Sequence, residues 1–408
     1  MSKRGYVVRP QTALITRGFD PRMSVGAARP PVYRSSTYVF SSPEAAATAF
    51  AVALGKQPCD AEHGELIYSR LAHPNANILE DQIVALEPKA EAAAVFNSGM
   101  AAITTLFLMT CPPGTTFVYT TPLYGGTYHF IHGLLSSLGV TGIPVPAGNT
   151  KELRHAIRAA LDLRMVFIET PSNPTLEMSD IGAAAEEARD RPERPLVAVD
   201  NTLLGPVLQH PLTVGADLAV YSATKYLSGF SDMLAGVILG TNVKVVEELR
   251  VLRAILGNIL QPDECWMLDS RLPTVSFRMH RQSKNAQHIV ESLIGHDSIS
   301  RILYPSLIKD TEQLRIRDKQ CRFPGGMFSL ELKGGIRGAF DFLRKLNIIK
   351  NAVSLGGVES LACHPATTTH SEMTPEDLTH AGVTESLVRV SVGVEDWRDL
   401  LADIRQAL

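Results

Sequence analysis

Short apolar runs alternate with segments of helical character through the middle of the chain, and this alternation restricts the fold more than any other feature. Runs typical of buried strands lie at residues 92–96, 116–119, 165–169 and 196–199. Helical segments such as residues 77–86, with apolar residues at helical spacing, lie between or beside them. The alternation predicts an α/β domain with a largely parallel sheet. Ligand-binding groups of such a sheet lie on loops at the carboxyl ends of its strands.

Polar residues follow these strands at the positions where ligand groups are expected. Glu169 and Asp200 each end an apolar run, and Lys225 follows the hydroxyls of Ser222 and Thr224 after a further strand. A lysine can form a Schiff base with the aldehyde of pyridoxal 5'-phosphate (PLP), hydroxyls can bind its phosphate, and a buried aspartate can pair with its pyridine nitrogen. The combination predicts a PLP site, although Ser-x-Thr-Lys alone is more often an ordinary turn or strand end.

Composition restricts the class of protein further. The 408 residues are 45% hydrophobic and 20% charged, with a net charge of −3. This length suits one large domain and a smaller one, and the charge gives no electrostatic signal for nucleic acid. The 5 cysteines are scattered without a CxxC pair, so we expect no disulfide framework, no metal site and a cytoplasmic location. No apolar run approaches the roughly 20 residues of a membrane span.

The chain divides into three parts. Residues 1–72 are a proline-broken N-terminal arm, in which only an alanine-rich segment that starts at Ser42 has helical character. Such an arm cannot bury itself, so we expect it to stay loose or to contact a neighbouring subunit. Residues 73–275 are the PLP-binding α/β domain. Residues 276–408 begin with a long helical pattern, contain alternating strand patterns, and are predicted to form a smaller α+β domain.

Two glycine-containing segments have the character of binding loops. Ser98, Gly99 and Met100 follow a strand and open a helix, and the free N–H groups of a helix N-terminus favour a phosphate. Tyr124 precedes a glycine pair, where its ring could lie over a pyridine ring. Taken alone, each segment is more often an ordinary helix cap or turn.

Two arginines also need an explanation. Arg70, with Tyr68, lies where the arm meets the first helix, and its guanidinium matches the geometry of a phosphate, although a surface pair is the alternative. Arg389 lies inside an apolar strand, where a buried charge needs a partner. That partner is either a substrate carboxylate or the acid of a structural ion pair.

Together these motifs resemble the Cys/Met metabolism (trans-sulfuration) family of PLP-dependent enzymes, closest to methionine γ-lyase and cystathionine γ-synthase-like members. The matching segments are residues 68–74, 98–103, 124–127, 169–175, 200–202, 222–226, 354–361 and 389–393. The resemblance implies the fold of type I PLP-dependent transferases, which is aspartate aminotransferase-like. It also implies a homotetramer, a dimer of dimers with shared active sites.

The resemblance further implies a role for each motif residue. Lys225 would bind the cofactor covalently and move protons, Asp200 would pair with the pyridine nitrogen, and Tyr124 would stack on the ring. Asn173 would contact the phenolic oxygen of the ring. The phosphate would be bound by Ser98, Gly99, Met100, Ser222 and Thr224, joined by Tyr68 and Arg70 of a neighbouring subunit. The carboxylate of an amino-acid substrate would be bound by Ser354 and Arg389.

Family members remove an α-proton and expel the γ-substituent of an amino acid. The remaining fragment then takes up a nucleophile (γ-replacement) or yields a 2-oxo acid and ammonia (γ-elimination). Val353 stands where members that act on cystathionine typically carry Glu, so the distal ammonium of cystathionine would lack a partner. Gly126 stands where methionine γ-lyases typically carry Cys. We predict γ-elimination on methionine, homocysteine or an O-substituted homoserine, with γ-replacement as the alternative.

A PLP fold retained only for binding or assembly is the alternative from another class of protein. The joint presence of Lys225, Asp200, Tyr124 and Arg389 argues against it. We assign no role to the lone histidines, which are commonly structural; they are His73, His364 and His370.

Overall fold

Two β-sheets organise the chain in a computed structural model that describes residues 8–53, 56 and 65–408. The strands are β1 (Ala92–Phe96), β2 (Thr116–Thr121), β3 (Thr141–Pro146), β4 (Leu163–Glu169), β5 (Leu196–Asp200), β6 (Leu218–Ser222), β7 (Gly236–Gly240), β8 (Ile299–Leu303), β9 (Met327–Leu332), β10 (Lys350–Asn351), β11 (Leu361–Cys363) and β12 (Leu387–Ser391). The helices are α1 (Pro10–Thr16), α2 (Pro43–Ala53), α3 (Pro74–Ile83), α4 (Gly99–Thr110), α5 (Gly125–Phe130), α6 (Thr150–Ala159), α7 (Ile181–Asp190), α8 (Gly205–Leu208), α9 (Pro211–Val214), α10 (Val243–Leu256), α11 (Pro262–Arg271), α12 (Val275–Leu293), α13 (Thr311–Gln320), α14 (Gly335–Lys345), α15 (Pro375–His380) and α16 (Trp397–Ala407).

The larger sheet has seven strands in the order β1-β7-β6-β5-β4-β2-β3. Strands β2 to β6 pair in parallel, and β7 runs antiparallel to both β1 and β6. The prediction of a largely parallel sheet is therefore confirmed. The sequence pattern did not indicate β3, because Pro144 and Pro146 interrupt it. Prolines are tolerated there because β3 lies at the edge of the sheet.

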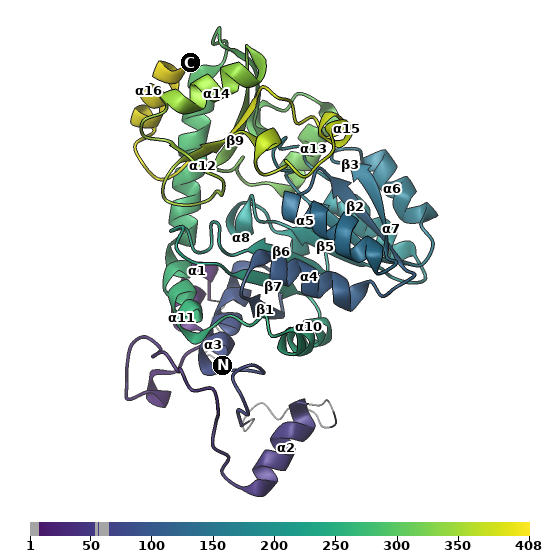
Figure 1. The fold of residues 1–408 in the computed structure, drawn as a ribbon. Helices are drawn as coiled ribbons and strands as arrows, with labels where there is room; N and C mark the ends of the chain where they lie inside the picture. Colours follow the sequence, from purple (N-terminus) through teal and green to yellow (C-terminus); the bar gives the residue numbers. More distant parts are fainter. Residues whose placement is uncertain (1–7, 54–55, 57–64) are drawn as a thin grey trace.

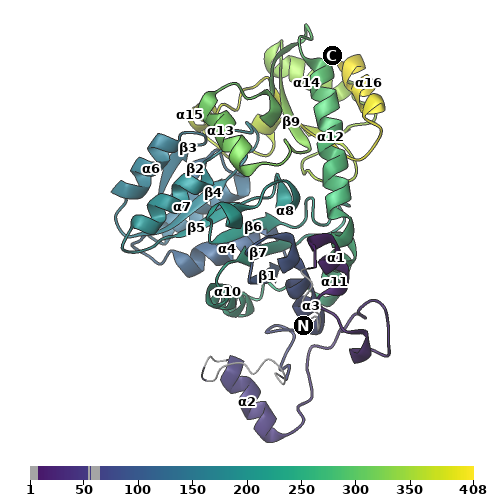
Figure 2. The same cartoon turned by 180° about the vertical axis from the view of Figure 1, so that it is seen from behind.

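Helices cover both faces of this sheet, as comparison of Figures 1 and 2 shows. On β4, Met165 and Phe167 point into the apolar cluster formed with α4, α5 and α10. The alternate residues Val166 and Ile168 point into the cluster formed with α3, α6 and α7. A parallel strand buried on both faces needs apolar residues at nearly every position. This requirement explains the continuous apolar runs of the sequence.

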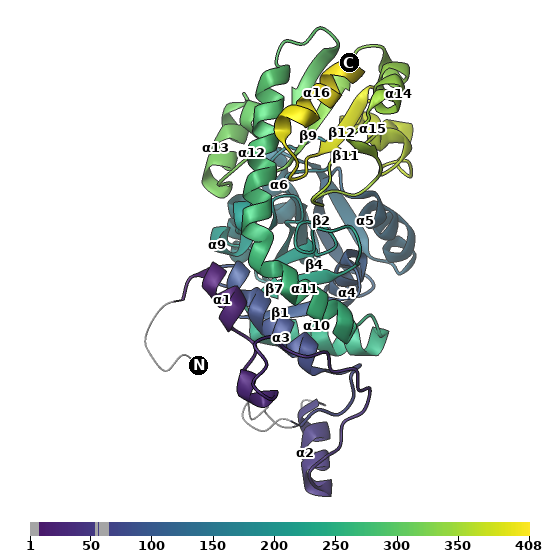
Figure 3. The same ribbon diagram turned by 90° about the vertical axis from the view of Figure 1, so that its left-hand side faces the viewer.

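The smaller sheet has five strands in the order β10-β11-β12-β9-β8. Its apolar face packs against α12, α14 and α16. Figure 3 shows α12 running from beside α11 up to this sheet, so one long helix contacts both halves of the chain. The domain boundary predicted between residues 275 and 276 falls at the first turn of α12, and its exact position stays a prediction.

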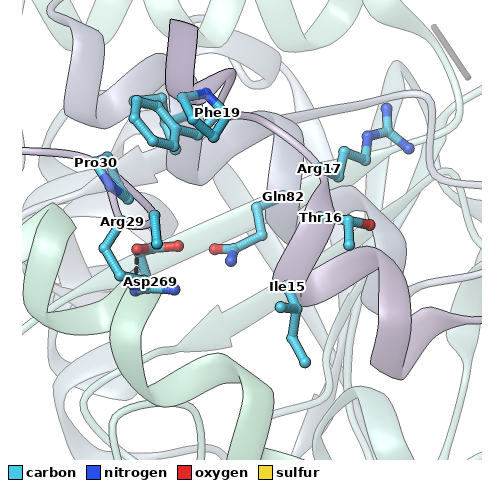
Figure 4. A pocket seen from close by; sticks show the side chains of 11 residues that line it. Ile15, Thr16, Arg17, Phe19, Arg29, Pro30, Gln82 and Asp269 are labelled. Carbon is cyan, nitrogen blue, oxygen red and sulfur yellow. Dashed lines mark hydrogen bonds and ion pairs between the residues drawn. The ribbon is translucent and has the colours of Figure 1, made fainter. Parts of the chain in front are cut away.

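The N-terminal arm packs on its own chain over part of its length. Helix α1 lies against α3 with Leu14 buried, and Trp266 Nε1 of α11 donates to the carbonyl of Pro30 at 2.9 Å. A cavity of about 270 Å³ remains between the arm, α3 and α11, beside the ion pair of Arg29 and Asp269 (Figure 4). The expectation that the arm cannot pack on its own chain is wrong for this segment, because α1 presents apolar side chains to α3.

The later part of the arm contains the helix predicted after Ser42. Helix α2 forms at the alanine-rich segment and projects away from the body of the molecule (Figures 1 and 3). Residues 1–7, 54–55 and 57–64, which belong to the predicted arm, lie outside the described residues. Contact of the arm with a neighbouring subunit stays a prediction.

Candidate active site

The carboxyl ends of three neighbouring parallel strands bring the predicted polar residues together. Glu169 is the last residue of β4 and is paired in register with Asp200, the last residue of β5. Strand β6 lies beside β5 and ends at Ser222, shortly before Lys225. The spatial grouping expected from the strand ends is therefore present in the structure.

Lys225 lies at the junction between the two halves of the chain. Its Nζ donates a hydrogen bond to Ser354 Oγ at 2.8 Å, across a sequence separation of 129 residues. Burial, aided by the positive charge of Arg389, lowers the pKa of Lys225 to about 8. A lysine with this pKa is partly neutral near neutral pH, and only the neutral amine can attack a carbonyl carbon.

Arg389 is only 3% exposed and holds this junction from the second sheet. Its Nη1 donates to Asn173 Oδ1 at 3.1 Å and its Nη2 donates to the Ser354 carbonyl at 2.9 Å. Within the described residues no carboxylate forms an ion pair with Arg389, which argues against the alternative of a structural ion pair. A guanidinium has five N–H donors, so Arg389 retains capacity for a carboxylate.

Ser354 has a strained backbone at the centre of these contacts. Its φ is 100°, a region that residues other than glycine adopt at a cost of roughly 1–3 kcal/mol. The hydrogen bonds from Lys225 and Arg389 hold Ser354 there, with its hydroxyl and its carbonyl both directed at the site. Such strain is typical of residues that must present a polar group at a fixed position.

Asp200 has the properties that a protonated pyridine nitrogen needs from its partner. It is 8% exposed, and its Oδ1 accepts one hydrogen bond from Thr202 N at 3.0 Å. Burial raises the pKa of Asp200, and no cation among the described residues is paired with it. A buried carboxylate without a cation is costly, and a bound pyridinium would supply the missing charge. The residues present therefore fit PLP at this position.

A cradle for an anion lies at the start of α4. The free N–H groups of its first turn follow Ser98, whose Oγ accepts from Ala101 N at 3.0 Å. A Cβ at Gly99 would lie 2.8 Å from Ser222 Cβ, so only glycine lets the helix approach Ser222 this closely. Thr224 Oγ1 already accepts from Ala235 N at 3.0 Å. The cradle therefore combines backbone donors with neighbouring hydroxyls, as a phosphate requires.

The glycine that departs from the family pattern has a packing role. A Cβ at Gly126 would lie 2.7 Å from Tyr124 Cε1 and 3.2 Å from Met100 Sδ. The Tyr124 ring, whose residue is 44% exposed, therefore rests over Gly126 and beside Met100. A cysteine at this position would require the ring to move, so Gly126 is matched to this placement of Tyr124.

Two predicted residues lie apart from this group within the single chain. Arg70 Nη1 donates to the Ala254 carbonyl of α10 at 2.7 Å, and its guanidinium lies 5.9 Å from the centre of the Tyr68 ring. In the described part of the chain, neither side chain forms a hydrogen bond with Lys225 or with the cradle at Gly99. A role for Tyr68 and Arg70 at the phosphate bound by a neighbouring subunit stays a prediction.

The structure also gives contacts at the site to two residues for which the sequence predicted no role. Thr202 joins two strand ends, because its N donates to Asp200 while its Oγ1 accepts from Ser222 N at 2.8 Å. His370 is fully buried, and its Nε2 lies 2.9 Å from the carbonyl of Asn173. Burial lowers the pKa of His370 to about 4, so it is neutral at neutral pH. No pattern in the sequence marks it, because its position depends on how residues 364–380 fold back.

The other two histidines have structural contacts. His73 caps α3, where its Nδ1 accepts from Ala76 N at 3.2 Å. His364 Nε2 lies 2.8 Å from the Glu385 carbonyl. Across residues 8–53, 56 and 65–408, no group of three or more His, Cys, Asp or Glu side chains is arranged to hold a metal ion. The same residues include no helix with both the length and the apolar character needed to cross a lipid bilayer.

Three features of the site define a PLP-dependent enzyme of fold type I. They are a lysine that follows a parallel strand, a buried aspartate at the end of the neighbouring strand, and a helix N-terminus suited to a phosphate. The family described as Cys/Met metabolism PLP-dependent enzyme matches residues 11–408. The chain therefore belongs to the Cys/Met metabolism family and uses PLP. These findings confirm the predicted family, fold class and cofactor.

Relatives of known activity divide between elimination and replacement. The L-methionine gamma-lyase of Pseudomonas putida is 40% identical over 97% of this chain and 96% of its own length. The cystathionine gamma-synthase of Mycobacterium bovis is 35% identical over 98% of this chain and 96% of its own length. The crystal structure of a cystathionine gamma-lyase from Micromonospora echinospora matches with a TM-score of 0.88 and 32% identity, over 98% of this chain and 99% of that one. The chain is similar to enzymes of the trans-sulfuration type, and both reactions occur among them.

Proposed function

We propose that the protein catalyses γ-elimination on an L-amino acid with a neutral γ-substituent, such as methionine, homocysteine or an O-substituted homoserine. The products are a 2-oxo acid, ammonia and the leaving group. The single observation that carries this choice is Val353, an uncharged residue directly before Ser354 at the junction of the two halves. The alternative is a γ-replacement synthase.

The residues described above are assigned roles toward the cofactor. Lys225 would attach to it covalently, Asp200 would pair with the pyridine nitrogen, Tyr124 would lie against the ring, and Asn173 would contact the phenolic oxygen. The phosphate would be held by Ser98, Gly99, Met100, Ser222 and Thr224. When bound, PLP withdraws electrons from the amino acid, which permits loss of protons from Cα and Cβ and departure of the γ-substituent.

The chain's own residues bind the amino acid and move its protons. The substrate carboxylate binds to the Arg389 guanidinium, close to the Ser354 hydroxyl. This places Cα beside Lys225, since Lys225 Nζ lies 2.8 Å from Ser354 Oγ. Once released from the cofactor, the Lys225 amine, with a pKa of about 8, can accept a proton at Nζ and return it to another carbon.

The absence of a charge at residue 353 supports a neutral γ-substituted amino acid over cystathionine as the substrate. Val353 is 51% exposed and offers no acid for the distal ammonium of a second amino acid. A bound ammonium would find no anionic partner at this residue, whereas a neutral thioether or ester needs none. The neutral γ-substituted amino acids are therefore the proposed substrates.

The proposed assembly is a homotetramer in which neighbouring subunits share active sites. Support comes from Tyr68 and Arg70, which lie apart from the cradle of their own chain. In the proposal these two residues reach the phosphate bound by the partner. A cytoplasmic location is proposed as well, in keeping with the free thiols of Cys111, Cys265, Cys321 and Cys363.

A substrate panel with matched variants at residue 353 tests the proposed function. The wild type should form 2-oxobutanoate from methionine, homocysteine and O-acylhomoserines without any added nucleophile, and should use cystathionine poorly. Val353→Glu should raise kcat/KM for cystathionine, while Val353→Gln, of the same shape but uncharged, should not. Product that forms only when a thiol is supplied would contradict γ-elimination. Equal use of cystathionine by all three proteins would contradict the role of charge at this position.

A further inference from the structure

Glu169 is a buried carboxyl at the centre of the site, and the proposed function gives it no role. It is 5% exposed, ends β4, and stands in register with Asp200 on β5. Its backbone N donates to Thr120 Oγ1 at 3.0 Å, which fixes the end of the strand. Burial of two neighbouring carboxyls at the ends of adjacent strands is costly, so the arrangement needs an explanation.

The Glu169 carboxyl faces backbone N–H groups of two separate loops. Oε2 accepts from the N–H of Tyr124 at 2.9 Å. The N–H of Asn173 also lies near the same carboxyl group and favours its charged form. Tyr124 is the residue assigned to the face of the cofactor ring, and Asn173 is assigned to its phenolic oxygen. The Glu169 side chain therefore lies against two residues assigned to the cofactor ring, Tyr124 and Asn173. It extends from β4, which pairs with the strand that ends in Asp200, the third residue assigned to the ring.

We propose that Glu169 is a positioning residue that acts in its uncharged form, holding Tyr124 and Asn173 against the cofactor ring. This inference rests on the assignment of PLP contacts made above, and it does not depend on whether elimination or replacement follows. Tyr124 is half exposed and precedes the short helix α5, and the hydrogen bond that its N–H donates to Glu169 ties its backbone to the end of β4.

The surroundings of Glu169 favour the protonated acid. Within the described residues no lysine, arginine or histidine forms an ion pair with it. Burial and the neighbouring Asp200 raise the pKa of Glu169 well above its ordinary range, against the smaller effects of the Tyr124 and Asn173 N–H groups and of the Arg389 charge. Because a bound pyridinium would neutralise Asp200, the negative charge belongs on Asp200 and the proton on Glu169.

Three substitutions separate shape from charge at this position. Glu169→Gln keeps the length and an oxygen acceptor but cannot ionise. Glu169→Asp keeps the acid but withdraws it by about 1.5 Å, one carbon–carbon bond, so that it no longer reaches Tyr124 N. Glu169→Ala removes the acceptors altogether. If Glu169 acts by positioning in its uncharged form, Glu169→Gln should be the variant that retains the affinity for PLP.

The test measures PLP binding to each apoenzyme and the pH titration of the bound cofactor's absorption, so it requires no turnover. Glu169→Gln should bind PLP within about threefold of wild type, and the Asp and Ala variants about tenfold more weakly, as expected for the loss of the hydrogen bond from Tyr124 N. Glu169→Gln should also leave the midpoint of the pH titration unchanged. Were Glu169 ionised, removal of its charge would stabilise the deprotonated cofactor and lower that midpoint.

Two results would overturn the proposal. One is Glu169→Asp binding PLP as wild type does while Glu169→Gln binds as weakly as Glu169→Ala, which would show that charge matters and position does not. The other is equal PLP affinity in all four proteins. Thermal unfolding of the apoenzymes is recorded in parallel, because a purely structural role would lower stability without this ranking of cofactor affinities. Failure of γ-elimination in the substrate panel would leave these binding results unaffected.

Discussion

Replacement of Arg389 by leucine removes a charged group that faces Lys225 and Ser354 from the second sheet. The substitution leaves the Asn173 side chain and the Ser354 carbonyl without their donors at 3.1 and 2.9 Å. It also leaves the substrate carboxylate without its cation, and loss of one partner from such a buried pair costs about 2–5 kcal/mol. At about 1.4 kcal/mol per tenfold, kcat/KM should fall roughly 30- to 3,000-fold.

The assay compares steady-state kinetics of wild type, Arg389→Leu and Arg389→Lys on several amino acids, together with the visible spectrum of the bound cofactor. The lysine variant keeps the charge but loses the planar fork, so its loss should be smaller, about tenfold. Every amino acid should be affected alike, because all share the carboxylate, while the cofactor stays bound. A leucine variant with unchanged kcat/KM would refute the role of Arg389 in substrate binding.

Three further outcomes are expected. Lys225→Ala should lose turnover together with the visible band that borohydride reduces in wild type, and a retained reducible band would place the cofactor on another lysine. The rate at which apoenzyme recombines with PLP should rise with pH through about 8, since deprotonation produces the reactive amine of Lys225. Arg389→Leu removes a nearby positive charge that lowers the pKa of Lys225, so this variant should move the pH profile of the rate to higher pH. A profile that does not move would contradict this electrostatic effect. Mixing inactive Arg70→Ala with inactive Lys225→Ala subunits should restore some activity through hybrid sites, whereas no recovery after demonstrated subunit exchange would argue against shared sites.

The sequence predicted the large sheet because its strands are buried on both faces. The apolar run at residues 92–96 coincides with β1, and the runs ending at Glu169 and Asp200 coincide with the ends of β4 and β5. Parallel strands place their carboxyl ends at one edge, so residues distant in sequence could be grouped without knowledge of the packing. Strand β3, with two prolines at an edge, carries no such pattern.

Contacts between the two halves of the chain could not be predicted in the same way. The hydrogen bond between Lys225 and Ser354 depends on how the second sheet packs against the first, and no local pattern encodes this. The packing of Tyr124 over Gly126 and the positive φ of Ser354 are likewise products of tertiary structure. Helix α1 was missed because its apolar side chains acquire a partner only when α3 is in place.

The most direct test of the central claim measures how a single substrate is divided between the two possible fates. An O-acylhomoserine is supplied with excess L-cysteine, and the 2-oxobutanoate formed is compared with the substrate consumed. γ-Elimination predicts that this ratio stays near one as the cysteine concentration rises. A ratio that falls toward zero while cystathionine accumulates would contradict the account and identify the enzyme as a γ-replacement synthase.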